Sequence, residues 1–570
     1  MTLYKSLLLS GIALSLAACG QEKDNLLQTA SDEAVEQSWC ISGGPIYTAL
    51  DAQPTVEAVA VSSGEITYAG PASDNWCQDD TADRINLDGA ALYPGLTDGH
   101  AHLIGIGLRE MTLNLEGTAS IEDLKSRLAK EVEQTSDGET IYGRGWIETH
   151  WPEGRFPTRQ DLDEVAPNNP VILTRADGHA AIVNSVTLEK SGIDRNTDAP
   201  FGGAINKNSD GVPTGMLIDK AQNLVSELMP TLTYERRQEA YKKGSELYAS
   251  RGWANIHSMS VDPNDVPLMQ ELANSEDIKI RVYNSIDLQN NRAMPTMDTE
   301  TAESDLITTR AIKLYADGAL GSRGAALLAP YSDDPDNEGL MTLKEVQVEA
   351  FLQTALRNGI QVNTHAIGDR ANRYVLQWYK DAFETVPQSS WKVEDPRWRI
   401  EHAQIVDVSD IPLFAEYDII PSMQPSHAIG DLHFAVDRLG KKRLEGGYAW
   451  RSLIDAGSII VGGSDAPVEV GDPRIEFYAA TQRKDTEGYS NENWYPEEKV
   501  TRQEALKMFT IWPAYAAFEE NKLGTIEVGK RADFSAFKTD LMTAPGPEIL
   551  TSEPLFTMVN GKMAFDGRDK

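Results

Sequence analysis

The sequence predicts an α/β protein whose main part is a (β/α)8 barrel of the TIM type. Short apolar runs that suit β-strands alternate with helical patterns through the middle of the chain. Residues able to bind metal follow several of these runs, and the ends of parallel strands meet at the carboxyl-terminal mouth of such a barrel. After an N-terminal leader, roughly 550 residues without internal repeats remain, which suits one barrel with insertions.

The first residues predict export. Lys5 precedes an apolar stretch, 7–16, that is too short to span a membrane, so residues 1–18 have the layout of a signal peptide. Leu16-Ala17-Ala18-Cys19 resembles a bacterial lipobox, which predicts a polar tether, 19–37, anchored by a lipid on Cys19. An ordinary signal peptide is the alternative. Because Asp does not follow Cys19, we expect the periplasmic side of the outer membrane if the host has two membranes.

The net charge of the chain excludes some classes of binding partner. Lys and Arg number 52 against 87 Asp and Glu, which gives a formal net charge of −35 at pH 7. Such a surface repels nucleic acid and anionic lipid, so a small molecule is the partner we expect. The oligomeric state stays open, a homo-oligomer included.

Two cysteines, Cys40 and Cys77, remain after Cys19. In an exported protein this pair predicts one disulfide, and two unpaired buried thiols are the alternative. Neither cysteine lies near the metal ligands proposed below, which argues against a thiolate site.

Strand patterns at both ends of the chain predict a small β-sandwich domain built from residues 38–93 and 524–570. The barrel then occupies 94–523. The patterns behind this prediction are a hairpin over 56–61 and 65–69 and strands over 532–537 and 556–565, the last turning at Asn560-Gly561.

Helix and strand signals alternate within the barrel region. Thr342 and Glu345 predict a capping box that opens a helix ending at Gly359, and a strand over 360–364 then leads to His365. A helix over 448–456 is followed by a strand over 458–461, which leads to Asp465. Thr501 predicts a second capped helix. The stretch from about 113 to 230 interrupts the alternation, so we expect an insertion after the first barrel strand that covers the barrel mouth.

The strongest local signal is the pair His100 and His102. Residues two apart on a strand share a face, so both imidazoles can point at one cation, and neutral imidazole is a good ligand for zinc and similar metals. The HxH pattern alone is weak, but an apolar run and flexible glycines precede it.

Lys313 stands in the middle of the apolar run 311–316. A buried ammonium is costly, so a neutral amine is favoured there, and a neutral amine can add carbon dioxide to form a carbamate that bridges two cations. A strand-edge lysine that reaches solvent and an ion pair with Asp317 are the alternatives.

His365, His402 and Asp465 also follow strand patterns. Each histidine alone is more often a satisfied core residue, and Asp465 alone could be a helix N-cap. Their common position at strand ends predicts that they converge with His100, His102 and Lys313 in a two-metal hydrolase site.

The order HxH, strand lysine, histidine, histidine and strand-end aspartate resembles the amidohydrolase superfamily. The longer motifs around these residues resemble the family 3 branch of this superfamily, which includes N-substituted formamide deformylases. One departure is Ser258, where the branch often has aspartate, and this leaves the role of His257 open. The matching stretches are PGLTDGHAH (94–102), RGW (144–146), DGHAAIVNS (177–185), KLYADGALGSRGAAL (313–327), VNTHAIGDRA (362–371), RIEHAQ (399–404), MQPSHAIGD (423–431), YAWRSL (448–453), GGSDAPVE (462–469) and LGTIEVGKRADF (523–534).

The resemblance implies a role for each residue. His100 and His102 would hold one divalent metal, for which zinc is the expected ion, and His365 and His402 would hold a second. Lys313, as a carbamate, would bridge the two. Asp465 would ligate the first metal, take the proton of the attacking water and pass it to the leaving amine. Sequence leaves open whether one or both positions are filled.

Four further residues are tentative substrate contacts: Trp146, His179, Arg323 and His427, with Asp431 a weaker candidate at the pocket rim. Trp146 and His179 could equally stabilise the insertion, and Arg323 could pair with Asp317. The expected function is hydrolysis of a non-peptide carbon–nitrogen bond in an amide, formamide or cyclic amide. A lactone or ester hydrolase and an exported binding lipoprotein with an inactive site are the alternatives.

Overall fold

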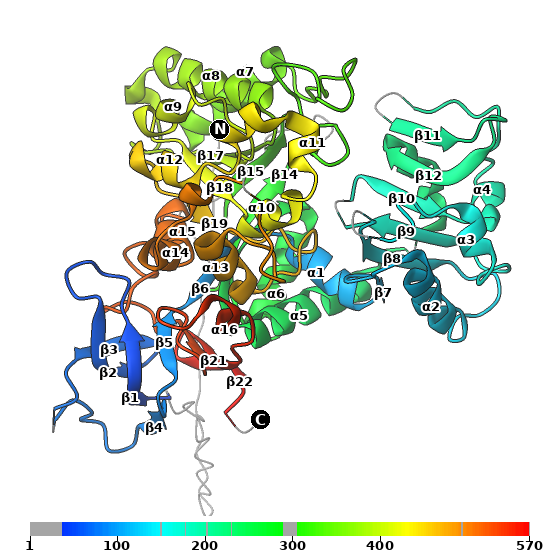
Figure 1. The fold of residues 1–570 in the computed structure, drawn as a ribbon. Helices are drawn as coiled ribbons and strands as arrows, with labels where there is room; N and C mark the ends of the chain where they lie inside the picture. The colour runs from blue at the N-terminus through cyan, green and yellow to red at the C-terminus, as the bar shows by residue number, and fades with distance from the viewer. Residues whose placement is uncertain are drawn as a thin grey trace, which may run out of the picture. The chain divides into compact units, whose positions relative to one another are not determined.

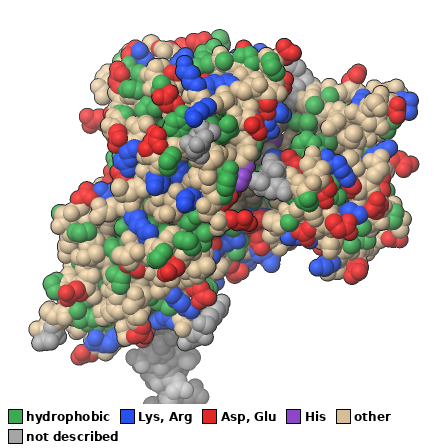
Figure 2. All heavy atoms as spheres, viewed as in Figure 1, with side chains coloured by type: hydrophobic (Ala, Val, Ile, Leu, Met, Phe, Trp, Pro, Cys, Tyr) green, Lys and Arg blue, Asp and Glu red, His purple; other side chains and the backbone are tan. Residues whose placement is uncertain are grey.

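The computed structural model describes residues 37–568 apart from 74, 149–150, 177, 201–202, 230, 289–304 and 492–493. The predicted signal peptide, Cys19 and nearly all of the predicted tether lie outside these residues. Within the described part of the chain, no helix is long and apolar enough to cross a membrane. Acidic side chains are scattered over the face shown in Figure 2, in keeping with the net charge of −35.

Eight parallel strands form the barrel, so the predicted fold class is confirmed. Each strand pairs with the next one in the chain, and every residue of the first and fifth strands is buried. Strands covered on both faces tolerate such continuous burial. The strands are β6 (Leu96–Ala101), β13 (Trp253–Val261), β14 (Arg281–Asp287), β15 (Ile307–Tyr315), β16 (Gln361–Ala366), β17 (Arg399–His402), β18 (Ile420–Met423) and β19 (Val461–Gly462).

Hydrogen bonds next to the last strand close the barrel. The Asp98 carboxylate on β6 accepts hydrogen bonds from the Ser464 backbone N–H at 2.9 Å and the Ser464 hydroxyl at 2.5 Å. The Tyr248 hydroxyl donates to the same carboxylate at 2.9 Å. The Asp465 N–H donates to the His100 carbonyl at 2.6 Å. These bonds hold the segment after β19 against β6, and so hold Asp465 against the HxH pair.

Helices surround the barrel strands (Figure 1). One face of α8 shows why: Ala371, Val375, Tyr379 and Ala382 are buried at the spacing of a single helix face. The longer helices are α1 (Leu103–Glu110), α5 (Tyr234–Arg251), α6 (Val266–Asn274), α7 (Glu345–Asn358), α8 (Asp369–Thr385) and α13 (Pro473–Gln482). The shorter ones are α9 (Ile411–Glu416), α10 (Pro425–Asp431), α11 (Ala435–Leu439), α12 (Trp450–Asp455), α14 (Arg502–Met508), α15 (Ile511–Ala516) and α16 (Gly546–Leu550).

Short 3-10 helices connect several of these elements. They are η1 (Lys220–Leu228), η2 (Pro263–Asp265), η4 (Gln388–Ser390), η5 (Lys441–Gly446) and η6 (Pro496–Glu498).

The predicted capping box at Thr342 is wrong, whereas the one at Thr501 is confirmed. Helix α7 begins at Glu345 with Lys344 as its N-cap, and no side chain caps it. The Thr342 hydroxyl instead donates to the Tyr315 carbonyl at 2.5 Å, so it serves the end of β15. The end of α7 is as predicted, because Gly359 takes the left-handed φ of 68° that favours glycine. At Thr501 both hydrogen bonds of the box are present.

The insertion after the first barrel strand contains its own six-stranded sheet, in the order β11-β12-β10-β9-β8-β7. Ile172 and Leu173 are neighbours on β9 but belong to different buried clusters, so both faces of this sheet are covered. Its elements are β7 (Leu113–Asn114), α2 (Ile121–Val132), β8 (Ile141–Trp146), α3 (Arg159–Asp163), β9 (Val171–Arg175), β10 (Ala180–Val183), α4 (Ser185–Lys190), β11 (Gly203–Lys207) and β12 (Pro213–Asp219).

Strands from the two ends of the chain join in one sheet around a separate buried core. β20 pairs with β5 antiparallel, which joins residues more than four hundred positions apart. The strands are β1 (Trp39–Tyr47), β2 (Thr55–Ser62), β3 (Glu65–Gly70), β4 (Asp83–Asn86), β5 (Ala91–Pro94), β20 (Phe534–Phe537), β21 (Pro554–Val559) and β22 (Lys562–Asp566).

The predicted disulfide is confirmed. Cys40 and Cys77 are bonded, with their Cα atoms 5.9 Å apart. The bond ties β1 to the connection between β3 and β4.

Candidate metal centre

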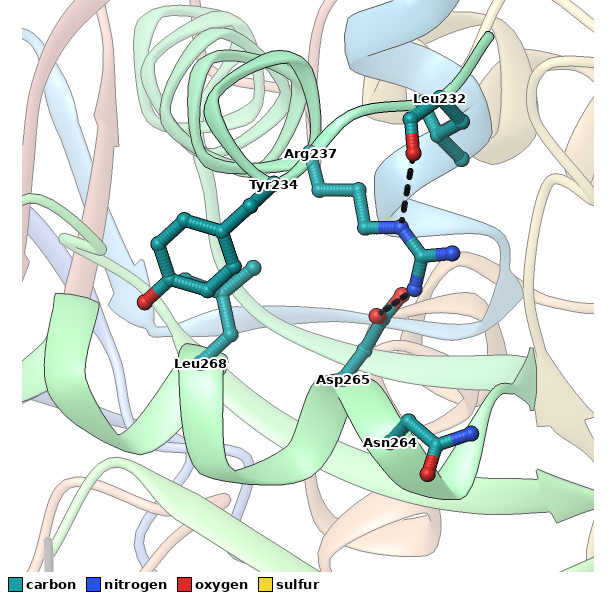
Figure 3. A pocket seen from close by; sticks show the side chains of 6 residues that line it. All are labelled: Leu232, Tyr234, Arg237, Asn264, Asp265 and Leu268. Carbon is teal, nitrogen blue, oxygen red and sulfur yellow. Dashed lines mark hydrogen bonds and ion pairs between the residues drawn. The ribbon is translucent and has the colours of Figure 1, made fainter.

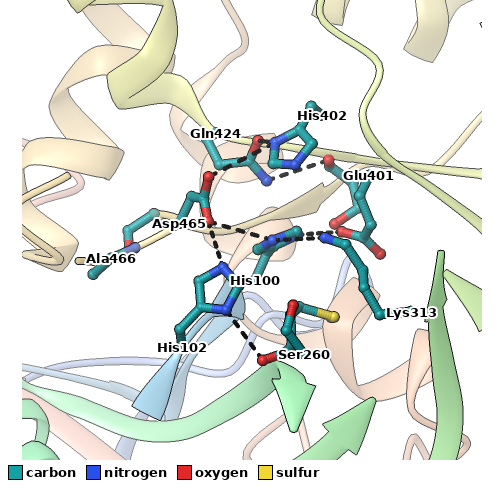
Figure 4. A network of polar contacts seen from close by, with 12 residues as sticks. His100, His102, Ser260, Lys313, Glu401, His402, Gln424, Asp465 and Ala466 are labelled. Atoms are coloured by element: carbon teal, nitrogen blue, oxygen red, sulfur yellow. Dashed lines mark hydrogen bonds and ion pairs between the residues drawn. The ribbon is translucent and has the colours of Figure 1, made fainter. Parts of the chain in front are cut away.

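Six side chains predicted as metal ligands meet at the carboxyl ends of the barrel strands (Figure 4 labels all of them except His365). His100 lies on β6, and His102 directly follows it. Lys313, His365 and His402 lie on β15, β16 and β17, and Asp465 follows β19. The separation in sequence is large, but parallel strands deliver their ends to one mouth.

Asp465 is the central group. Its Oδ1 lies 3.0 Å from Nε2 of His102 and 3.4 Å from Nε2 of His100. Donor atoms of His100, His402 and Asp465 all lie within 4.8 Å of one another. The His365 ring centroid is 4.5 Å from that of His402, so the fourth histidine is adjacent. One cation among these atoms would replace several contacts between histidine and carboxylate.

Hydrogen bonds to Nδ1 select the tautomer of three histidines. Nδ1 of His100 donates to the Glu401 carboxylate at 2.5 Å, and Nδ1 of His402 donates to Oε1 of Gln424 at 2.8 Å. Nδ1 of His102 donates to the Met259 carbonyl at 3.1 Å. In His100 and His402 this leaves the Nε2 lone pair for a metal, whereas Nε2 of His102 faces the Asp465 carboxylate at 3.0 Å, a contact that a cation between them would replace.

An orphaned atom also fits a metal. Nε2 of His365 is buried and makes no hydrogen bond among the described residues; it lies 3.4 Å from Oδ1 of Asp317, a carboxylate that already accepts three backbone N–H groups. A buried polar atom without a partner is costly, and a cation would satisfy it. The donor set of imidazole nitrogens and one carboxylate is the kind that zinc and related ions prefer. The residues present therefore fit a divalent metal.

Lys313 is 1% exposed, and its Nζ lies 3.2 Å from Nε2 of His100. Burial lowers the pKa of Lys313 to about 8, although Glu401 and Asp465 oppose the shift. Roughly one amine in ten is then neutral at pH 7. The alternative ion pair with Asp317 is not made, because that carboxylate accepts the backbone N–H groups of Ala326, Ile367 and Gly368.

Burial and charge keep the site ready for a cation. Burial, with the neighbouring Lys313, lowers the pKa of His100 to about 4, so the ring is neutral near pH 7. Burial by itself raises the pKa of Asp465, but His100 and the hydrogen bond from His102 outweigh it and hold that pKa well below its usual range. Neutral imidazoles and an ionised carboxylate are the protonation states that bind metals.

Glu401 was missed as a functional residue by the sequence reasoning. It is fully buried, and besides His100 it pairs with Arg399, whose Nη2 donates to Oε2 at 3.1 Å. Arg399 also donates to the Gly99 carbonyl at 2.6 Å and contacts Nδ1 of His257 at 2.8 Å. The signal was present, because two charged residues alternate with apolar ones on a strand. His257 thus belongs to the layer beneath the ligands.

Strand geometry alone would not place His402 in the site. Consecutive strand residues point to opposite faces, yet Glu401 contacts His100 and the His402 ring lies 4.7 Å from the His100 ring. The φ angles of His402 and Ala403 are 72° and 41°, a left-handed turn that brings the ring back toward the site. Asp465 also has a positive φ, 61°. Backbone conformations of this kind are costly and cluster at functional sites.

Two tentative substrate residues lie in the insertion. Trp146 is fully buried in the core of the insertion, and its indole N–H donates to the Leu173 carbonyl at 2.8 Å. This position fits the structural alternative. His179 is partly exposed between β9 and β10.

Arg323 does not pair with Asp317, the alternative that the sequence suggested. Its guanidinium donates to both carboxylate oxygens of Asp333, at 3.1 and 2.9 Å. Its φ is 59°, in the left-handed region, within the turns that follow β15.

His427 lies beside the metal ligands. Its Nε2 is 3.6 Å from Oδ2 of Asp465, and its ring centroid is 5.8 Å from that of His402. Asp431, the last residue of α10, accepts hydrogen bonds from Gln404 at 2.8 Å and from the Tyr448 hydroxyl.

A cavity of about 310 Å³ lies between the start of α5 and α6. None of the predicted site residues lines it (Figure 3). Its charged groups satisfy each other: Arg237 donates to Asp265, and the Tyr241 hydroxyl donates to the same carboxylate at 3.0 Å. It offers no chemistry comparable to the barrel mouth.

The barrel and the ligand set at its mouth define a metal-dependent hydrolase. The chain belongs to the amidohydrolase family, which it matches over residues 83–565.

Comparisons with individual proteins agree. The Bacillus subtilis protein YtcJ, which bears the name of an amidohydrolase, is 31% identical over 92% of this chain and 98% of its own. The N-substituted formamide deformylase of Arthrobacter pascens is 27% identical over 90% of this chain and 95% of its own. The crystal structure of a metal-dependent hydrolase from Pyrococcus horikoshii has the same fold, with a TM-score of 0.71 at 24% identity over 90% of this chain and 99% of its own.

Proposed function

We propose that the protein hydrolyses a non-peptide carbon–nitrogen bond in a small amide, formamide or cyclic amide. The observation that carries the proposal is the set of three Nε2 atoms, on His100, His102 and His402, whose rings are fixed through Nδ1 and gathered around the Asp465 carboxylate. The formamide deformylase among the relatives supports the choice of bond.

We assign the ligands to two metal positions. His100, His102 and Asp465 would hold one ion, and His365 and His402 the other, with Lys313 as a carbamate between them. Zinc suits this mixture of nitrogen and oxygen donors. When bound, such ions polarise a carbonyl and lower the pKa of water to about 7.

Asp465 is the residue we assign to proton transfer. Its carboxylate is ionised and faces the mouth, so it can accept a proton from the attacking water. The same oxygen can then deliver that proton to the departing amine nitrogen, which leaves as a neutral amine. Glu401 and Gln424 hold His100 and His402 in the required tautomers throughout.

A substrate panel tests the proposed function. Zinc-loaded protein is given N-formyl amines, other amides, a cyclic amide, lactones and esters, and each product is quantified. Faster hydrolysis of the amide group is expected. A preference for lactones or esters would show that the site hydrolyses those bonds instead. No hydrolysis despite bound metal would favour a binding lipoprotein.

We also propose that the protein is exported and anchored to the cell envelope through a lipid on Cys19. The lipobox-like Leu16-Ala17-Ala18-Cys19 and the polar segment after it support this. Mass spectrometry of the native N-terminus should find Cys19 first and lipidated; a mature chain that starts beyond Cys19 would rule the anchor out.

A further inference from the structure

Two carboxylates, Asp431 and Glu469, form what we call the acidic wall next to the metal centre. Asp431 ends α10, and Glu469 lies between Asp465 and α13. Burial, together with the negative charges of Asp431 and Asp465, raises the pKa of Glu469 to about 8. At that pKa the acid is mostly neutral near pH 7, and a cation bound beside it would favour the ionised carboxylate.

His427 stands between the wall and Asp465. It is 8% exposed, and neither ring nitrogen has a hydrogen-bond partner among the described residues. Its Nε2 lies 3.6 Å from Asp465 and 3.8 Å from Oε1 of Glu469. A buried ring without partners that faces two carboxylates is a group that awaits a ligand.

Among the described residues, no Lys or Arg side chain pairs with the Glu469 carboxylate. Within the described part of the chain, His427 is the one basic side chain that contacts the Glu469 carboxylate. Arg109 is close in space but unavailable: its side chain is 1% exposed and pairs with Glu110 and Glu116, each at 3.1 Å. It donates to the Glu469 carbonyl at 3.1 Å, which fixes the backbone and leaves the carboxylate uncompensated.

We infer that the substrate carries a positively charged amine, which binds between His427 and Glu469 while the scissile carbonyl lies at Asp465. This inference rests on the proposed function and names the substrate class: amides of small diamines, acylated on one nitrogen. An ammonium group donates charge-assisted hydrogen bonds to Glu469 and to the bare nitrogen of His427. Because Nε2 of His427 lies within 4 Å of both Asp465 and Glu469, at 3.6 and 3.8 Å, the linker between amide and ammonium is short.

A matched substrate pair tests the inference. N-formyl-1,4-diaminobutane carries the ammonium group, and N-formylpentylamine replaces it with a methyl group. The expected ratio of their kcat/KM values is about tenfold or more in favour of the cation, since a hydrogen bond to a charged group contributes on the order of 10- to 100-fold. A ratio near one, or a preference for the neutral compound, would overturn the inference.

Glu469→Gln keeps the size of the side chain and removes the carboxylate that would ionise beside a bound ammonium group. It should reduce the substrate ratio by about tenfold, mainly through the KM of the cationic compound. Glu553→Gln is the matched control, because Glu553 is exposed and pairs with Lys538 on the surface. The control should leave the ratio unchanged. An equal loss in both variants, or in neither, would contradict the role of Glu469.

Calorimetry separates this inference from the proposed function. Binding of both compounds to zinc-loaded wild type and Glu469→Gln protein needs no turnover. Suppose that neither compound is hydrolysed, but the cationic compound binds wild type more tightly and loses this advantage in Glu469→Gln. The proposed reaction is then wrong, and the cation site is supported. If both are hydrolysed but bind alike, the reaction stands and the cation site is wrong.

Discussion

Replacing Glu401 by Gln should weaken metal binding without touching a ligand. Glu401 Oε2 accepts hydrogen bonds from Nδ1 of His100 at 2.5 Å and from Arg399 at 3.1 Å, while its Oε1 lies 2.8 Å from Nε of Arg399. In either orientation the new amide NH2 meets an N–H of Arg399. In one orientation the amide NH2 also faces Nδ1 of His100. The His100 ring then takes the other tautomer, with its proton on Nε2, the nitrogen that should bind metal.

The structure sets two magnitudes for this change. Loss of a carboxylate that orients a metal-binding histidine typically costs about 10- to 100-fold in metal affinity. Glu401 and Arg399 are both fully buried, and removal of one partner from such a pair costs about 3–5 kcal/mol in the free energy of unfolding. The Glu401→Gln protein should therefore bind zinc more weakly and unfold at lower denaturant concentration.

Zinc affinity is measured by competition with a chromophoric chelator, and unfolding by circular dichroism in urea. Glu553→Gln is the control, because Glu553 is exposed and pairs with Lys538 on the surface. Zinc affinity of Glu401→Gln within about twofold of wild type would refute the claim that Glu401 sets the His100 tautomer.

Three further changes have defined outcomes. Lys313→Ala should lose metal, and short carboxylic acids should partly restore activity by taking the place of the carbamate; full metal content and activity would make Lys313 a structural residue. Asp465→Asn should fold but lose about 100-fold or more in kcat; a loss below about tenfold with metal still bound would move proton transfer to another residue, with His179 examined first. Cys40→Ala with Cys77→Ala should lower the free energy of unfolding by about 2–4 kcal/mol, since the bond closes a loop of 37 residues; an unchanged urea midpoint would contradict this.

The barrel and the convergence of its ligands could be predicted because their signals are local. Each strand is a short apolar run, and His100, Lys313 and His365 occupy those runs or their ends. Parallel strands in a barrel leave one place for such ends to meet. The disulfide could be predicted from two cysteines in a chain for which residues 1–18 predict export.

The remaining features depend on tertiary contacts that no local pattern encodes. The Thr342 hydroxyl bonds to the end of β15 instead of capping α7. Arg323 pairs with Asp333, ten residues away, a contact set by the turns that follow β15 and not by a local pattern. Glu401 and His402 reach one site only through a positive φ, which strand periodicity does not predict for histidine.

Metal content and chelation test whether the barrel mouth holds a catalytic metal. The purified protein is analysed for metal, and hydrolysis of the N-formyl amines is measured before chelation, after chelation and after zinc is restored. We predict about one to two divalent ions per chain, loss of hydrolysis with their removal, and recovery with zinc. Hydrolysis that continues at full rate in protein stripped of metal would contradict the assignment of His100, His102, His365, His402 and Asp465 as a catalytic metal centre.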